Sequence, residues 1–342
     1  MRKLGKNINI CDFITNTVEQ VIINNKLINN NDKIVVAVSG GPDSMCLLSV
    51  LIELQEILKN KYNINYSLIV AHVNHMIREE SEYEKDYVES FCNDKNIKFH
   101  YLKENIPELS KDLKLSEETC GRKVRYEFFE KIRKIENAQK IAVAHNEDDN
   151  VETILLNLIR GCGLKGLIGM DYKFEYLIRP LIDIEKKDIL DYNVIKNLNP
   201  CFDKTNFEDT YLRNKVRLRL LPELKEKYNS NITQNIIRMK KILEQDEDFL
   251  KKYTNNIIEQ SIIENNSVIK FRFDNIMKEH IAIQTRSIRS ILEIKLRNLE
   301  GIENIHIVDI LKLLKNNIVG KKYIIGNKFN IEIISKNIAV IK

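Results

Sequence analysis

The stretch Val36-Ala37-Val38-Ser39-Gly40-Gly41-Pro42-Asp43-Ser44 decides the fold of the first part of this chain. It begins inside a β-branched run, Lys33 to Val38, which predicts a buried parallel strand. Two glycines follow, and the segment from Asp43 to Leu58 then has the periodicity of a helix. The stretch therefore predicts a strand, a tight glycine turn and a helix in direct succession.

This turn has the composition of an anion-binding site. Gly40 and Gly41 let backbone N–H groups approach a phosphate closely, and a helix N-terminus favours negative charge. Ser39 and Ser44 add hydroxyl donors, and Asp43 adds a carboxylate that suits Mg²⁺. The GxxxxGK[ST] and GxGxxG spacings are both missing, so a Walker A loop and a dinucleotide turn are excluded. An ordinary turn capped by serine is the alternative interpretation.

Strands and helices alternate through the first two-thirds of the chain, which predicts an α/β fold with a doubly wound, mostly parallel sheet. Ligands of such sheets bind at the carboxyl ends of the strands. Further strands are expected at Tyr66 to His72, Lys98 to Leu102, Lys140 to Ala144 and Glu175 to Ile178. Further helices are expected at Glu79 to Cys92, Glu117 to Ile135 and Asp149 to Ile159.

The pattern changes after about Pro222, which suggests a second domain. Asn231 to Lys252 and Ile281 to Leu299 have the periodicity of amphipathic helices. Alternating residues around Gly326-Asn327, from Lys321 to Ile341, predict a terminal β-hairpin. We therefore expect a catalytic domain over residues 1–220 and a mainly helical domain with a small β element over residues 221–342.

Charge is unevenly divided between the two parts of the chain. Residues 1–212 hold 29 Lys and Arg against 34 Asp and Glu, whereas residues 213–342 hold 25 against 15. The basic second part predicts a polyanionic partner such as nucleic acid, with a solvated charged surface as the alternative.

Composition excludes several classes of protein. Apolar runs are too short to span a membrane, and the N-terminal residues lack the apolar stretch of a secretory signal. The cysteines are scattered without a CxxC pair, which predicts reduced thiols in a cytoplasmic protein rather than a zinc site or disulfide framework. They are Cys11, Cys46, Cys92, Cys120, Cys162 and Cys201.

Five segments in order carry a resemblance to a known family. Ser39 to Ser44 resembles the SGGxDS loop of the PP-loop ATP pyrophosphatases. The other four resemble motifs of the tRNA(Ile)-lysidine synthetases within that superfamily: Ala71 to Arg78 (HVNHxxR), Gly121 to Phe129 (ARxxRYxFF), Ala142 to Thr153 with Arg160 to Gly163 (AxAHHxxDDxxET…RGxG), and Asp203 to Arg217 (DxSNxxxxxxRNxxR). Order and spacing hold over about residues 30 to 225. The departures are Asn146 for a common histidine, Asn150 for glutamine and Thr205 for serine.

The resemblance implies a reaction and its participants. ATP with Mg²⁺ adenylates the C2 oxygen of the wobble cytidine in tRNA(Ile) with a CAU anticodon, releasing pyrophosphate. The ε-amine of L-lysine then displaces AMP, which forms lysidine. The basic second domain would bind the tRNA. The expected setting is the cytoplasm, with no membrane partner, and a homodimer is left open beside a monomer.

The resemblance also implies roles for individual residues. The expected catalytic residues are Asp43, Asp149 and Arg125, with Asp43 holding Mg²⁺. Lysine would be bound by Asp149, Glu152 and Arg125, and tRNA by Arg213 and Arg217. ATP would be bound by Ser39, Gly40, Gly41, Pro42, Asp43, Ser44, His72 and His145.

Several of these residues also have plainer interpretations. Asp149 and Glu152 are three apart on a helix and face the same way, but acids are also favoured at any helix N-terminus. Asp148 fits N-capping, and the choice between Asp148 and Asp149 as the key acid stays open. The arginines could be solvated surface residues, and His72 a packed or capping histidine.

Three other functions are weighed against lysidine formation. A tRNA thiolation enzyme on the same fold would usually need paired cysteines, which are lacking here. A small-molecule adenylating synthetase would not explain the basic C-terminal part. A non-catalytic RNA-binding protein would not explain why the loop and the acids occur together.

Overall fold

The computed structural model describes residues 9–76, 81–201, 212–296, 299, 301–325 and 329–342. The chain forms two compact units, Met1–Lys240 and Lys241–Lys342. The motif residues Ile77, Arg78, Asp203, Thr205 and Asn206 lie outside the described residues.

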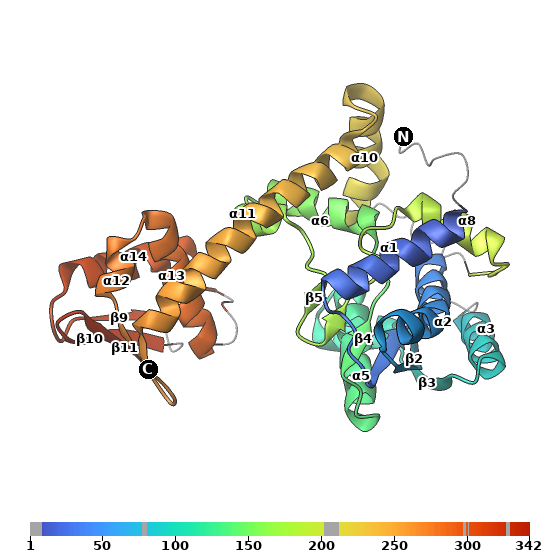
Figure 1. Ribbon diagram of the computed structural model, residues 1–342, viewed down its shortest axis with the longest axis horizontal. Coiled ribbons are helices and arrows are strands. Elements are labelled where there is room, and N and C mark those ends of the chain that lie inside the picture. Colours follow the sequence, from blue (N-terminus) through green and yellow to red (C-terminus); the bar gives the residue numbers. More distant parts are fainter. Residues whose placement is uncertain (1–8, 77–80, 202–211, 297–298, 300, 326–328) are drawn as a thin grey trace. The chain divides into compact units, whose positions relative to one another are not determined.

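The first unit is built on a six-stranded sheet in the order β3-β2-β1-β4-β6-β5. Figure 1 labels four of these strands, β2, β3, β4 and β5. All neighbouring pairs are parallel except β5 with β6, so the expected α/β fold with a mostly parallel sheet is confirmed. The strands are β1 Asp32–Ala37, β2 Tyr66–Asn74, β3 Lys98–Lys103, β4 Lys140–Ala142, β5 Lys173–Phe174 and β6 Leu177–Ile178. The strand expected from Glu175 to Ile178 is present as β6 but begins only at Leu177, because Glu175 has a φ of 52° in the turn between β5 and β6.

Alternating side chains of β1 fill two different cores, as a strand covered on both faces requires. Ile34 and Val36 pack with one set of helices, α1 Ile10–Asn24, α2 Pro42–Tyr62 and α8 Lys186–Ile195. Val35 points to the other face and packs with Phe128 and Ile132 of α5 Glu117–Ile135. The sheet is therefore doubly wound, and every side chain named here is at most 7% exposed.

Helices that follow the strands bring the chain back across the sheet. They are α3 Ser81–Asp94, α4 Ile106–Leu113, α6 Glu147–Ile159 and α7 Leu164–Leu167. Asn146 caps α6 by a reciprocal pair of hydrogen bonds with Asp149, which is the arrangement of a capping box.

The two units divide within α11 at Lys240 and Lys241, rather than at the expected boundary of 220 and 221. The cause is a small apolar core in which Val216, Leu221 and Ile236 pack against Val151 and Leu155 of α6. The segments that carry it are α9 Leu212–Lys215, the π-helix Val216–Leu220, α10 Leu221–Glu223, the π-helix Leu224–Tyr228 and α11 Ile232–Ser261.

The second unit is an antiparallel sheet packed with helices, in the order β7-β8-β11-β10-β9. Its helices are α12 Asp274–Lys278, α13 Ile281–Leu296 and α14 Asn304–Asn316, and its strands are β7 Ile262–Asn265, β8 Ile269–Arg272, β9 Lys322–Ile325, β10 Phe329–Ser335 and β11 Ile338–Ile341. The expected hairpin strands pair as β9 and β10, although their turn at Gly326-Asn327 lies outside the described residues. This unit contains more β structure than the sequence pattern predicted.

None of the helices in the described part of the chain combines the length and the apolar character needed to cross a membrane.

Candidate functional site

The predicted site residues lie mainly at the carboxyl ends of β1, β2 and β4. β1 lies between β2 and β4 in the sheet: the chain runs from β1 outward through β2 to β3 and then crosses back to β4 on the other side of β1. This is the switch point at which doubly wound sheets bind ligands. Ser39 follows β1, His72 is near the end of β2, and His145 follows β4.

The glycine turn has the predicted strand-loop-helix conformation. Gly40 has a φ of 86°, a conformation that L side chains rarely adopt, and α2 begins at Pro42. The two serines bond within the loop: Ser44 Oγ accepts from the Ser39 backbone N–H at 3.1 Å and lies 3.2 Å from Ser39 Oγ. The loop is thus pre-formed, and both hydroxyls face its concave backbone.

Asp43 is held by two groups from other elements. Lys186 Nζ donates to both carboxylate oxygens, at 2.7 and 2.6 Å, and Asn146 Nδ2 donates to Oδ1 at 3.2 Å. Burial raises the pKa of Asp43, and Lys186 opposes that rise. An ammonium group already bonded to this carboxylate shows that the position stabilises a cation.

Asp149 and Glu152 face the same direction, and both accept from arginines. Arg213 donates to Glu152 at 2.9 Å and to Asp149 at 3.1 Å. Arg217 bonds both carboxylates as well, at 2.9 Å to Asp149 and 3.0 Å to Glu152. The Glu152 side chain is 1% exposed and that of Asp149 is 14% exposed. From the sequence, the two acids were predicted to bind lysine and the two arginines to bind tRNA. In the structure, these acids and arginines lie together and bond one another.

Two predicted ATP ligands, His72 and His145, have definite hydrogen-bond partners. His72 Nδ1 lies 2.8 Å from the carbonyl oxygen of Val38, and its ring stacks on Tyr101 at 5.9 Å between centroids. His145 Nδ1 lies 3.3 Å from Arg179 Nε. Neither was predicted to have these partners, because Val38 and Arg179 are far away in sequence.

Arg125, the third catalytic candidate, is not brought into contact with Asp43 or Asp149. It is exposed and makes no hydrogen bond or ion pair with any residue that the structure describes. It lies near His75 and helps to lower the pKa of that histidine. Among the described residues, the structure therefore does not join Arg125 to the acids with which it was predicted to act.

A cavity of about 310 Å³ joins the acids of the site. Asp43, Asp148 and Glu152 line it together with Lys186 and Arg217, and its remaining walls are Asn146, Leu221, Pro222 and Lys225. Asp148 also accepts from the backbone N–H of Lys186 at 2.8 Å. Mg²⁺ commonly takes one or two carboxylates plus substrate phosphates, so Asp43 and Asp148 fit that ion.

Lys186 and Arg179 are the functional candidates that the sequence did not single out. Lys186 is the first residue of α8, which follows the buried run Leu181 to Ile184 after β6. A helix that begins after the last parallel strand must start at the carboxyl edge of the sheet, and this signal could have identified Lys186.

The site predicts how stability depends on pH. Burial lowers the pKa of both His75 and His145 to about 4, against about 6.5 for a free histidine. As the pH falls, the unfolded chain therefore binds these protons before the folded chain does. The contribution of the two neutral histidines to the free energy of unfolding is fully present above pH 6.5 and is lost as the pH falls toward 4. Each histidine contributes up to about 1.4 kcal/mol per pH unit in this window. Urea unfolding between pH 7.5 and 4.5 measures the slope.

Carboxylates also titrate in this range, so the control is the double variant His75→Gln/His145→Gln. We expect a flatter pH dependence of the free energy of unfolding in the variant. An identical slope in both proteins would contradict the assignment.

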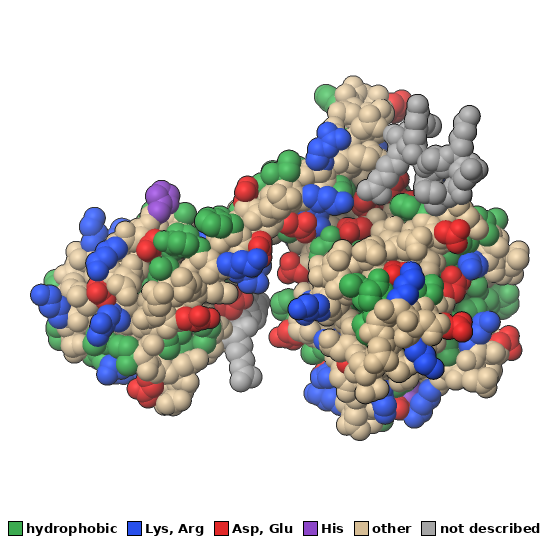
Figure 2. Space-filling model, in the orientation of Figure 1, with side chains coloured by type: hydrophobic (Ala, Val, Ile, Leu, Met, Phe, Trp, Pro, Cys, Tyr) green, Lys and Arg blue, Asp and Glu red, His purple; other side chains and the backbone are tan. Residues whose placement is uncertain are grey.

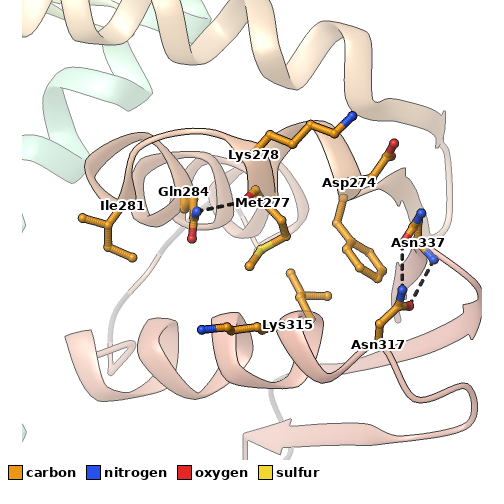
Figure 3. A pocket seen from close by; sticks show the side chains of 10 residues that line it. Asp274, Met277, Lys278, Ile281, Gln284, Lys315, Asn317 and Asn337 are labelled. Carbon is orange, nitrogen blue, oxygen red and sulfur yellow. Dashed lines mark hydrogen bonds between the residues drawn. The ribbon is translucent and has the colours of Figure 1, made fainter.

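A second cavity, of about 540 Å³, lies in the C-terminal unit and contains none of the predicted site residues. Figure 3 shows Lys278 of α12 and Lys315 of α14 on opposite sides of it, with Asn317 and Asn337 bonded to each other at one end. Phe273, Met277 and Leu314 supply apolar walls.

The sequence of this chain is similar to those of a known domain family and of several curated relatives. The family model of the PP-loop domain matches residues 13–224. The tRNA(Ile)-lysidine synthase of Caldanaerobacter subterraneus subsp. tengcongensis is 42% identical over 289 residues, which are 84% of this chain and 61% of that protein. The protein of the same name from Clostridioides difficile is 38% identical over 312 residues, which are 90% of this chain and 66% of that protein. The chain thus spans less than two thirds of the length of these relatives.

One solved structure shares the fold. The U34-tRNA thiolase NcsA from Methanococcus maripaludis, with its [4Fe-4S] cluster, superposes with a TM-score of 0.53 at 23% identity. The match covers 71% of this chain and 87% of that one.

Proposed function

Because the chain belongs to the PP-loop domain family, we propose that it uses ATP to adenylate the wobble cytidine of tRNA(Ile) with a CAU anticodon and then attaches L-lysine there. The observation that carries this proposal is the joining of the loop acid Asp43 and the acid pair Asp149 and Glu152 at one edge of the sheet, with Asn146 bonded to both Asp43 and Asp149. The name of the relatives at 38–42% identity supports the same reaction.

The glycine turn would bind the phosphates of ATP. The N-terminus of α2 follows the loop and favours negative charge, and Ser39 and Ser44 can exchange their mutual hydrogen bonds for phosphate oxygens. Donors fixed in this way before the reaction stabilise the charge that develops on the leaving pyrophosphate. Asp43 and Asp148 would hold Mg²⁺, which would neutralise phosphate charge when bound.

Asp149 and Glu152 would bind the ε-amine of lysine. They already hold two guanidinium groups, so the position favours cations strongly. The free amine has a pKa near 10.4 and must lose a proton before it attacks. Asp149 is the more accessible of the two and can accept that proton, whereas the buried Glu152 would orient the amine. Asp148 lines the cavity with Asp43 and accepts from the backbone N–H of Lys186, whereas Asp149 lies beside Glu152, which favours Asp149 as the acid that meets the amine.

The thiolation alternative receives no support from the described residues. Their cysteines are all free, and no group of three or more His, Cys, Asp and Glu converges on a metal position in the described ranges. Nor does any described feature favour a small-molecule synthetase or a non-catalytic protein over the proposed enzyme.

A direct test supplies the protein and Mg²⁺-ATP with four acceptor combinations: tRNA with lysine, tRNA alone, lysine alone and tRNA with ammonia. We expect the full yield of AMP and pyrophosphate only with tRNA and lysine together. Equal yield without RNA would instead indicate a small-molecule synthetase.

The tRNA would be bound by basic residues of the segment 213–240, before the unit boundary. The segment 213–240 holds 8 Lys and Arg against 2 Asp and Glu, and the second unit holds 17 against 13. The basic excess is therefore concentrated before the boundary, and Figure 2 shows basic and acidic side chains interspersed over the visible face of the C-terminal unit. Since Arg213 and Arg217 are engaged with acids, Lys215 and Arg238 are the exposed cations of this segment best able to meet phosphate.

We predict that Lys215→Ala/Arg238→Ala weakens tRNA binding and makes it less dependent on salt. Removing one lysine or arginine that pairs with a phosphate reduces the slope of log affinity against log salt by about 1. Filter binding between about 50 and 200 mM salt measures it. The control is Lys131→Ala, because Lys131 lies near the C-terminal end of α5, at the opposite edge of the sheet. Equal salt slopes in the double variant and the native protein would contradict this docking.

A further inference from the structure

The contact between Arg179 and His145 determines where the proton of His145 is. A guanidinium group has five N–H donors and no acceptor, so Arg179 Nε can only donate across the 3.3 Å to His145 Nδ1. His145 Nδ1 must then present its lone pair, and in a neutral imidazole the proton must lie on Nε2.

Arg179 is itself fixed in place. Its Nη1 donates to the carbonyl oxygen of Asp171 at 2.8 Å, and its backbone N–H donates to the carbonyl oxygen of Tyr172 at 2.9 Å. It follows β6 directly, so the sheet sets its position. The guanidinium is therefore held between a backbone acceptor and the imidazole of His145.

The second ring nitrogen of His145 is available to a ligand. His145 is half-buried, and Nε2 makes no hydrogen bond with any residue in the described part of the chain. His72, the other predicted histidine ligand of ATP, has the opposite tautomer. Its Nδ1 lies against the carbonyl oxygen of Val38, so the proton is on Nδ1. Its buried Nε2 is an acceptor that has no partner among the described residues.

The charges around His145 indicate which kind of ligand atom would accept a hydrogen bond from Nε2–H. Arg179 after β6, Arg122 of α5 and Arg213 of α9 all disfavour a proton on the ring, whereas Asp149 of α6 favours one. Burial acts in the same direction as the arginines, so the imidazole stays neutral at physiological pH. A neutral N–H donor among arginines suits an anionic oxygen.

We propose that Arg179 is a positioning residue that holds His145 in its Nε2–H tautomer, so that His145 donates a hydrogen bond to an anionic oxygen of a bound substrate and takes no proton from the attacking amine. The anionic oxygen belongs to a phosphoryl group of ATP or to the carboxylate of the amino acid. This choice of ligands depends on the proposed function, whereas the tautomer itself does not. The proton of the amine is then left to Asp149.

The first test is ¹⁵N NMR of the full chain with ring-labelled histidine, which reads the protonation of each ring nitrogen without any catalysis. The chain has six histidines, and the signals that disappear in His145→Gln identify residue 145. We expect a protonated Nε2 and an unprotonated Nδ1 in the native protein. A proton on Nδ1 would overturn the proposal, whatever the enzymatic activity.

The same spectrum tests the role of Arg179. In Arg179→Met we expect His145 to populate both tautomers, while the other five histidine signals report whether the fold is kept. Arg133→Met is the matched control, because Arg133 bonds Glu130 and lies over the ring of Tyr176, and it should leave the His145 signals unchanged. An unchanged tautomer in Arg179→Met would remove Arg179 from the proposal. If that variant does not fold, the native spectrum still decides the tautomer.

Kinetics identify the partner of Nε2–H. Glutamine at position 145 keeps an N–H donor near Nε2 and leucine does not, so we expect His145→Leu to lose about 10- to 100-fold more activity than His145→Gln. A raised KM for ATP indicates the phosphoryl oxygen, and a raised KM for lysine indicates the carboxylate. The acid limb of the pH profile should be the same in native protein and His145→Gln. Its disappearance in the glutamine variant would make His145 a general base and overturn the proposal.

Discussion

Replacing Asp43 by asparagine is expected to lower ATP-dependent modification of tRNA by about 10³-fold or more. The carboxylate follows the loop directly, lies beside the cavity acids and already carries the ammonium group of Lys186. An asparagine keeps the size but not the charge that Mg²⁺ and the phosphates require. A loss of about 4 kcal/mol of transition-state stabilisation corresponds to this change in rate. Single-turnover formation of AMP with saturating tRNA and lysine measures it.

The matched control is Asp94→Asn. Asp94 is an exposed acid at the end of α3, away from the loop, and its replacement should leave the rate unchanged. Thermal unfolding should show that Asp43→Asn remains folded. Near-native activity of a folded Asp43→Asn protein would refute the role assigned to the loop acid.

Replacing Glu152 by glutamine is expected to impair both stability and lysine transfer. The carboxylate is 1% exposed and bonds Arg213 and Arg217, so its loss leaves two guanidinium groups short of a partner. Hydrogen bonds to charged groups contribute about 1.5–3 kcal/mol, and both arginines keep Asp149 as a partner and are 28% and 37% exposed, so the cost should lie near the lower end, about 1.5 kcal/mol. We expect a fall of that size in the free energy of unfolding and a rise of at least about tenfold in KM for lysine.

Asp149→Asn separates the two effects. Asp149 is more accessible and would take the proton of the amine. We therefore expect Asp149→Asn to lower kcat by more, expressed as a free energy, than it lowers the free energy of unfolding. Glu127→Gln on the exposed face of α5 is the control for both measurements. If Glu152→Gln leaves KM for lysine unchanged, the acid pair is structural and the amine binds elsewhere.

The parts of the fold that depend on local sequence were predictable. The run Lys33 to Val38 and the two glycines predict β1 and the loop, because β-branched residues and a positive φ are local requirements. The helix at residues 10–24 was missed although Ile14, Val18 and Ile22 have helical spacing, because no motif drew attention to it. The true unit boundary was also missed, because it depends on apolar contacts between α6 and segments 60 or more residues later.

In the candidate site, too, the features that depend on local sequence were predictable and those that depend on tertiary contacts were not. Asp43, Asp149 and Glu152 could be found from residue type and spacing, since each follows a strand at the carboxyl edge. Their partners could not, because Lys186 and Arg213 reach them across sequence separations of 143 and 61 residues. The spacing of residues along a helix indicates which side chains share a face. Only the tertiary structure shows which charged side chains of other elements lie opposite that face. The ion pairs of Arg213 and Arg217 with Asp149 and Glu152 could therefore not be predicted from their spacing.

Lysidine formation can be measured by incubating radiolabelled L-lysine and Mg²⁺-ATP with a tRNA(Ile) transcript that carries the CAU anticodon, with native protein and Asp43→Asn in parallel. We expect label on the wobble cytidine with the native protein and almost none with the variant. Release of AMP and pyrophosphate on some other acceptor, with no label on the RNA, would contradict lysidine formation while leaving the PP-loop assignment intact.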